Sequence, residues 1–257
     1  MADRPQAPRR RQPARGTPPV GASRASSTPR RLPVALRRQA VAIADRLDQQ
    51  HPGATTELHY TNPFELLVAT ILSAQCTDAR VNQVTPALFR RYPDARAMAE
   101  ARPGELEPQI QPTGFFRMKT RSLLGMARRL VERHGGQVPA SMAALVELPG
   151  VGRKTANVVL GHALGVPGFP VDRHVLRVSN RLGVVRSLDP EIVEAHWCAR
   201  LPPERWTRTS DALILHGRRV CRPTPLCDRC HVRGDCAYYK ALGAKRRRAG
   251  GRDPAAR

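Results

Sequence analysis

The sequence predicts an all-α protein, and three observations indicate this fold class. Aromatic residues make up only 4% of the 257 residues although 41% are hydrophobic, so the core must consist of leucine, valine, alanine and isoleucine. Apolar residues recur at helical spacing along most of the segment 35–239. No run of alternating apolar and polar residues predicts a strand, and no repeat of fixed period occurs.

The first predicted helix begins near residue 35, where Ile43 and Leu47 lie one turn apart on one face. A second helix begins after Asn62, which can cap it, with Pro63 at its first position. This helix, over about residues 64–73, is apolar almost all round, so we expect it at the centre of the core. Further helices are predicted over about residues 79–90, 94–101, 104–110, 117–134, 142–148, 153–164, 172–182, 189–199 and 207–219.

The charge is distributed unevenly along the chain. Of the formal net charge of +22, residues 1–34 contribute +7 and residues 240–257 contribute +6, which leaves +9 for the body. Both ends are rich in Arg and Ala, the first also in Pro, and both lack apolar periodicity, so we predict two disordered basic tails over these ranges. A basic body with basic tails indicates a polyanionic partner such as nucleic acid.

Targeting and membrane segments are not evident. No apolar stretch approaches the roughly 18 residues that span a bilayer, and no apolar signal-peptide core follows the start. We therefore expect a cytoplasmic, nucleoid-associated monomer without a membrane partner. The Arg/Ala-rich composition is typical of a bacterial source.

A glycine-rich string joins two short helices predicted within about residues 142–164. It reads Leu-Pro-Gly-Val-Gly-Arg-Lys-Thr-Ala over Leu148–Ala156. Pro149 ends the first helix, and Gly150 and Gly152 permit backbone angles that other residues resist. The amides of the turn and of the next helix N-terminus then suit a phosphate group. A plain helix–helix turn with a glycine cap is the alternative for a Gly-x-Gly alone.

The full nine-residue string resembles the helix-hairpin-helix motif of DNA repair enzymes, and it is most similar to that of the endonuclease III family of DNA glycosylases. The resemblance covers roughly residues 35–239 and implies a two-lobed all-α fold with a DNA cleft between the lobes. It implies a six-helix domain over 56–166 that contains the hairpin, and a cluster-containing domain formed by 35–55 and 167–239. It also implies that the hairpin contacts DNA through Gly150, Gly152 and Arg153.

The same resemblance assigns the chemistry to two residues. The lysine that closes the hairpin string is the family's nucleophile and falls on Lys154. The segment Pro170–Val175 resembles a second motif, which places the catalytic aspartate at Asp172. The loop over 165–171 can span about 23–25 Å, enough to return Asp172 to the start of the helix that carries Lys154. Taken singly, Lys154 could instead bind phosphate and Asp172 could cap a helix.

The chemistry requires such a pair. A free lysine has a pKa of about 10.4, so a nucleophilic amine needs a lowered pKa. Arg153 and the helix N-terminus both favour that shift, whereas Asp172 would stabilise a cationic sugar or relay protons. The family resemblance implies attack on the anomeric carbon, a Schiff base, and strand cleavage by β-elimination.

Two further segments resemble the loops with which the family opens the base stack. Leu72–Asp78 nominates Gln75 to fill the gap in the DNA, and Thr113–Lys119 nominates Phe115 as an apolar wedge. A helix C-terminus is the alternative for Gln75, and a core position is the alternative for Phe115. The adenine-removing branch of the family carries a catalytic glutamate in the helix before Leu72–Asp78. No acid lies between Glu65 and Asp78 here, which argues against that branch.

Four cysteines cluster near the end of the chain, namely Cys221, Cys227, Cys230 and Cys236. Four thiolates at this spacing suit either zinc or an iron–sulfur cluster. The resemblance implies one 4Fe-4S cluster, with Arg229 in its loop as a phosphate contact. Only five residues separate the first two cysteines, whereas the common family pattern has six. A structural role for the cluster is favoured over redox catalysis.

The resemblance therefore implies a bifunctional DNA glycosylase with apurinic/apyrimidinic (AP) lyase activity that removes oxidised pyrimidines from double-stranded DNA. Its substrate would contain a damaged base or an abasic site. The alternatives are a monofunctional mismatch or adenine glycosylase, a non-enzymatic module that binds abasic DNA, and an iron–sulfur electron carrier.

Overall fold

The computed structural model describes residues 32–248, and no strand occurs in this range, which confirms the predicted all-α class. None of the helices in this range is both long and apolar enough to cross a bilayer. The α-helices are α1 (Val34–Gln50), α2 (Pro63–Leu72), α3 (Asp78–Arg91), α4 (Ala95–Ala99), α5 (Pro103–Ile110), α6 (Phe116–His134), α7 (Met142–Val146), α8 (Arg153–Ala163), α9 (Arg173–Leu182), α10 (Pro190–Cys198), α11 (Trp206–Arg219) and α12 (Ala237–Arg248). Short 3₁₀ turns are η1 (Gln111–Thr113), η2 (Pro203–Arg205), η3 (Cys227–Arg229) and η4 (Arg233–Asp235).

Helix α2 is central to the first hydrophobic core, as its sequence predicts. The side chain of Asn62 caps the helix by accepting a hydrogen bond from the Glu65 amide at 3.0 Å, and Pro63 occupies the first turn. Each residue from Leu66 to Leu72 is buried. Phe64 of α2 and Leu58 before it also belong to this core, and its other buried residues come from α3 to α8 and their connections.

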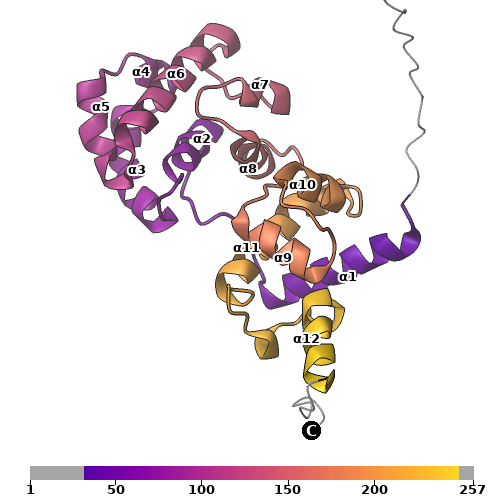
Figure 1. Ribbon diagram of the computed structural model, residues 1–257. Helices are drawn as coiled ribbons and strands as arrows, with labels where there is room; N and C mark the ends of the chain where they lie inside the picture. Colours follow the sequence, from indigo (N-terminus) through magenta and orange to yellow (C-terminus); the bar gives the residue numbers. More distant parts are fainter. Residues whose placement is uncertain (1–31, 249–257) are drawn as a thin grey trace, which may run out of the picture. The chain divides into compact units, whose positions relative to one another are not determined.

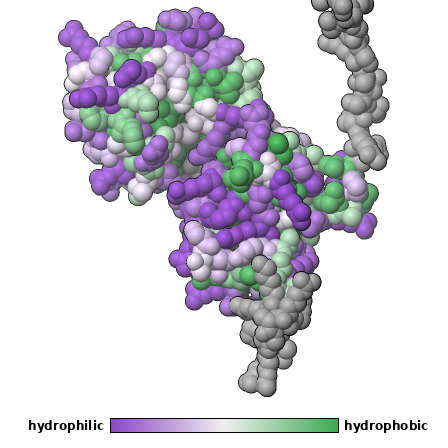
Figure 2. Space-filling view, viewed as in Figure 1, coloured by the Kyte–Doolittle hydropathy of each residue, from purple (hydrophilic) through white to green (hydrophobic). Residues whose placement is uncertain are grey.

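The second core joins segments that are far apart in the sequence. Helix α1 packs against α11, and α12 packs against α9, so the indigo helix in Figure 1 lies among the orange and yellow ones. Trp197 is fully buried, stacks on Phe169 with 5.9 Å between ring centroids, and donates its indole N–H to Ser179. Hydrophilic side chains cover most of the face seen in Figure 2.

The loop between α8 and α9 is held by a close contact with α8. Asn157 is buried, accepts a hydrogen bond from the Phe169 amide at 3.1 Å and donates one to Glu194 at 3.0 Å. A Cβ atom added to Gly168 would lie 2.3 Å from the Asn157 carbonyl oxygen, so only glycine fits there. The path of this loop, and with it the place of Asp172, is therefore fixed against α8.

The C-terminal end differs from the boundary expected from sequence. Helix α12 continues to Arg248, so the residues 240–248, which we predicted to be part of a disordered tail, are helical. The segment is rich in the good helix formers Ala, Lys and Arg, and Tyr239 anchors its start on the second core. The rest of both predicted tails, 1–31 and 249–257, lies outside the described residues.

Candidate active site

The predicted hairpin consists of α7, a turn and α8. Gly150 has a left-handed φ of +79°, and a Cβ atom there would lie 2.6 Å from the Cβ of Ser122 on α6. Gly152 is the N-cap of α8 and provides no side-chain hydrogen bond. The first amides of α8 therefore have no side-chain cap, and the positive end of the helix dipole favours an anion at this N-terminus.

We expect Gly150→Ala to lower the free energy of unfolding by about 1–3 kcal/mol, because alanine resists the left-handed φ and would displace Ser122. The matched control is Gly152→Ala. Nothing lies within 4 Å of a Cβ atom at that position, and its φ is negative. Urea denaturation measures both variants. Equal stabilities would contradict the steric argument.

Lys154 and Asp172 line the same pocket. Lys154 is the second residue of α8, and its side chain is exposed. Asp172 is the N-cap of α9, where its Oδ1 accepts hydrogen bonds from the amides of His174 and Val175 at 2.7 and 2.9 Å. Asp172 is thus both a helix cap and a pocket residue, which leaves Oδ2 for chemistry in the pocket.

Arg153, which precedes Lys154, is engaged elsewhere. Its guanidinium makes two 2.8 Å hydrogen bonds to the carboxylate of Glu194. This pairing raises the pKa of Arg153, chiefly through the hydrogen bond. The expected role of Arg153 as a free phosphate contact would require it to leave Glu194 or to share its charge.

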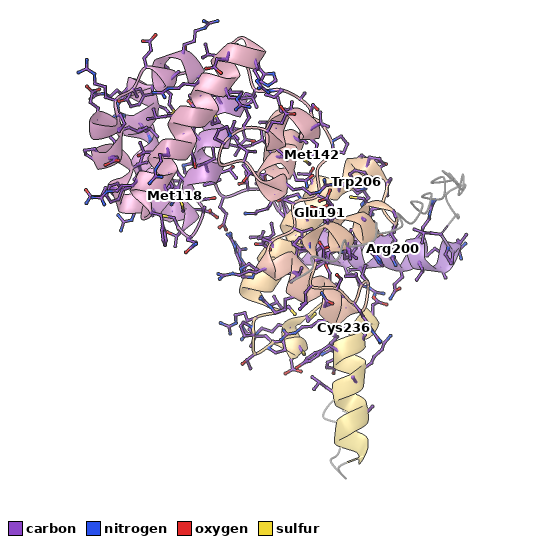
Figure 3. All side chains as sticks on the ribbon, turned by 45° about the horizontal axis from the view of Figure 1, so that its top comes forward. Met118, Met142, Glu191, Arg200, Trp206 and Cys236 are labelled. Atoms are coloured by element: carbon purple, nitrogen blue, oxygen red, sulfur yellow. The ribbon has the colours of Figure 1, made fainter. Side chains whose placement is uncertain are left out.

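The two expected DNA-opening residues share an unusual backbone conformation. Gln75 has a φ of +53° and Phe115 a φ of +48°, and no other non-glycine residue within 32–248 has a positive φ. Both side chains are exposed, Phe115 by 57%, so the core alternative for Phe115 is wrong; Phe116 packs on the first core instead. Met118, labelled in Figure 3, is also exposed, by 62%, and lies three residues after Phe115.

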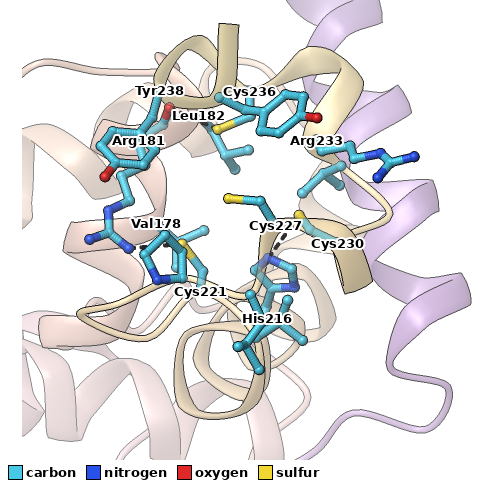
Figure 4. A pocket seen from close by; sticks show the side chains of 15 residues that line it. Val178, Arg181, Leu182, His216, Cys221, Cys227, Cys230, Arg233, Cys236 and Tyr238 are labelled. Atoms are coloured by element: carbon cyan, nitrogen blue, oxygen red, sulfur yellow. Dashed lines mark hydrogen bonds between the residues drawn. The ribbon is translucent and has the colours of Figure 1, made fainter. Parts of the chain in front are cut away.

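The four clustered cysteines surround one pocket, as Figure 4 shows. None of them is in a disulfide. Apolar side chains contribute much of the remaining lining, including Val178, Leu182 and Val232. Arg229, the expected phosphate contact, is exposed in η3 between the second and third cysteines.

Polar groups around this pocket point at sulfur atoms. His216 is buried, and its Nε2 lies 3.5 Å from the Sγ of Cys230, while Arg181 donates to the Sγ of Cys221 at 3.4 Å. Burial raises the pKa of the Cys230 thiol to about 11. A thiol in this position becomes a thiolate only when a nearby cation stabilises the negative charge, as a bound metal does.

Comparison with known proteins identifies the family. A family model described as "HhH-GPD superfamily base excision DNA repair protein" matches residues 68–203. The endonuclease III of Synechocystis sp. is 49% identical over 207 residues, which cover 80% of this chain and 94% of the relative. The chain belongs to the endonuclease III family. A solved non-covalent endonuclease III–DNA complex has a TM-score of 0.76 at 40% identity and covers 81% of this chain and 98% of that one. A trapped endonuclease III–DNA covalent intermediate has a TM-score of 0.75 at 40% identity and covers 80% and 98%.

Endonuclease III membership confirms the resemblance read from the hairpin string. The segment matched by the family model contains both Lys154 and Asp172, and it ends before Cys221. The roles of individual residues stay predictions. For the cysteines, the support in the structure is the shared pocket that they surround.

Other residues of the Lys154 pocket were not predicted from the sequence. His162 and Asp211 lie 3.3 Å apart, both nearly buried, and burial raises the pKa of the Asp211 carboxyl. Arg218 from α11 bonds to Asp78 at 3.1 Å. His162 lies eight residues after Lys154 on the same helix face, which could have indicated it, whereas Asp211 and Arg218 come from a remote helix without a motif.

Proposed function

We propose that this protein removes oxidised pyrimidines from double-stranded DNA and cleaves the strand at the resulting abasic site. As a member of the endonuclease III family, it is a DNA glycosylase with AP lyase activity in base excision repair. Lys154 and Asp172 share one pocket beside the hairpin, and this observation supports their assignment as the catalytic pair. Its substrate is DNA with a damaged base or an abasic site. The protein would act in the bacterial cytoplasm, at the nucleoid.

In this mechanism the neutral amine of Lys154 attacks the anomeric carbon of an extruded nucleotide and displaces the damaged base. Positive charge that develops on the sugar is stabilised by the carboxylate of Asp172 through Oδ2, because Oδ1 already accepts two amide hydrogen bonds. Ring opening gives a Schiff base between Lys154 and the sugar. Loss of a C2′ proton then expels the 3′ phosphate by β-elimination.

We expect Asp172→Asn to slow base release by about 10²–10³-fold while leaving stability within about 1 kcal/mol of the parent. Asparagine caps helices as well as aspartate does, so the variant removes the charge and keeps the cap. Single-turnover base release and thermal melting are the two measurements. Base release at the parent's rate, with an unchanged melting temperature, would show that the residue acts only as a cap.

We infer that Cys221, Cys227, Cys230 and Cys236 hold one 4Fe-4S cluster. The four thiols surround one pocket, and four thiolates at short range are the ligand set that a 4Fe-4S cluster takes. The four thiols would lose their protons on holding the cluster, which would tie the segment 221–236 together.

We also propose that the two cores correspond to two domains, residues 56–166 and residues 35–55 with 167–239. The basic tails would add contacts to phosphates that do not depend on sequence. The residues proposed to contact DNA are Gln75, Phe115, Gly150, Gly152, Arg153 and Arg229.

Borohydride trapping tests the proposed function directly. The protein is incubated with a duplex that contains one oxidised pyrimidine, sodium borohydride is added, and a covalent protein–DNA product is sought on a denaturing gel. We expect a trapped product, because reduction captures a Schiff base. Base release without trapping would favour a monofunctional glycosylase, and binding without base release would favour a non-enzymatic module.

A further inference from the structure

The two loops expected to open DNA are held together by one buried cation. Lys119 on α6 is only 5% exposed, although lysine is rarely buried. Its Nζ donates a hydrogen bond to the carbonyl oxygen of Leu72 at 2.7 Å and another to that of Thr113 at 2.8 Å. Leu72 ends α2 and lies three residues before Gln75, while Thr113 lies two residues before Phe115.

Both carbonyl groups need such a donor. The carbonyl of Leu72 belongs to the last turn of α2, where no further helical amide follows and the helix dipole is negative. Thr113 ends η1 and is itself buried. The main chain of Lys119 also takes part, because its amide donates to the Phe115 carbonyl at 3.0 Å. One residue therefore contacts the chain on both sides of the Gly114–Phe115 turn.

The cost of this arrangement argues for a role. Burial lowers the pKa of Lys119, which shows that the protein interior opposes its charge. Gln75 and Phe115 hold left-handed backbone angles that cost energy and persist only where the surroundings impose them. Two probes that must enter the same opened base pair, but lie 40 residues apart, also need a fixed separation.

We infer that Lys119 is a positioning residue that sets the Gln75 loop and the Phe115 loop in register, so that both enter the DNA stack together. The inference rests on the proposed function. It assigns Lys119 no contact with the reacting atoms. It predicts that loss of the two side-chain hydrogen bonds impairs opening of the duplex and leaves the chemistry of Lys154 intact.

The test uses Lys119→Met, which keeps the chain length and removes the donors. A duplex carries an abasic site next to 2-aminopurine, whose fluorescence rises when the stack opens. We expect a roughly tenfold to hundredfold weaker stack-opening equilibrium than in the parent. Borohydride trapping on the same abasic site in a single strand, where no stack must open, is expected to stay within about threefold. An unchanged fluorescence response would overturn the inference.

A double-mutant cycle separates positioning from mere destabilisation. Lys119→Met and Gln75→Ala are combined, and their effects on duplex opening are expected to be strongly non-additive, because Lys119 acts through the Gln75 loop. The control is Leu130→Ala, a fully buried site on the same helix, which should lower stability and add independently to Gln75→Ala. Additive effects for Lys119 as well would overturn the inference. If Lys119→Met does not fold, Lys119→Gln, which can still donate to one carbonyl, enters the same cycle.

The result can be told apart from a failure of the proposed function. A parent protein that neither traps nor opens the stack would refute the proposed function itself. A parent that does both, with Lys119→Met behaving like it, would refute only the positioning role.

Discussion

Lys154→Gln is expected to abolish base release and strand cleavage, by at least about a thousandfold, while the protein still binds damaged DNA. Glutamine has a similar length but no nucleophilic amine, so neither displacement of the base nor a Schiff base can occur. Lys154 is exposed at the second position of α8, which means that its replacement removes no buried contact. Single-turnover assays, borohydride trapping and an affinity measurement on the same duplex give the three readouts.

The matched control for this variant is Arg90→Gln. It also removes one positive charge from an exposed helical position, on α3. A small and equal loss of affinity in both variants is expected from the lower charge. Base release by Lys154→Gln at the rate of Arg90→Gln would remove Lys154 from its proposed role, whereas loss of binding alone would make it a phosphate contact.

Local patterns predicted the helices well because each carries its own signals. Asn62 and Pro63 mark the start of α2, and its apolar surface requires a central position. The boundary that failed was the C-terminal tail, where charge composition suggested disorder. There, good helix formers and the contact of Tyr239 with the second core extend α12 instead.

The candidate site could be predicted only where it follows short motifs. Lys154 and Asp172 are separated only by the rest of α8 and one loop. The length of that loop was enough to predict from sequence that the two side chains could lie close together. The His162–Asp211 pair and the Lys119 hydrogen bonds depend on how helices pack, and no spacing rule indicates that Lys119 reaches Leu72, 47 residues away. The pairing of Arg153 with Glu194 likewise results from tertiary packing, since 41 residues separate them.

The second large effect is expected for Cys230→Ser, which should lose the proposed cluster and destabilise the protein by about 3–5 kcal/mol. The segment 221–236 has little core of its own: its regular structure is two 3₁₀ turns, and only Val232 and Cys236 are buried. A segment this small needs a staple to stay folded. Iron and sulfide content, absorbance near 400 nm and thermal melting measure the outcome.

Cys198→Ser is the matched control, since Cys198 is half-buried, in no disulfide and outside the ring of four. It should retain iron and lose little stability. Loss of iron together with a lower affinity for DNA, but with trapping still possible at high protein concentration, would show that the cluster holds a DNA-contacting loop and takes no part in the reaction at Lys154. If the parent protein instead contained one stoichiometric zinc, the staple would be a zinc ion and the role of the four cysteines would be unchanged. A parent with no metal, and no change in stability on Cys230→Ser, would contradict a staple at this site, because the four thiols would then be ordinary side chains of a folded segment.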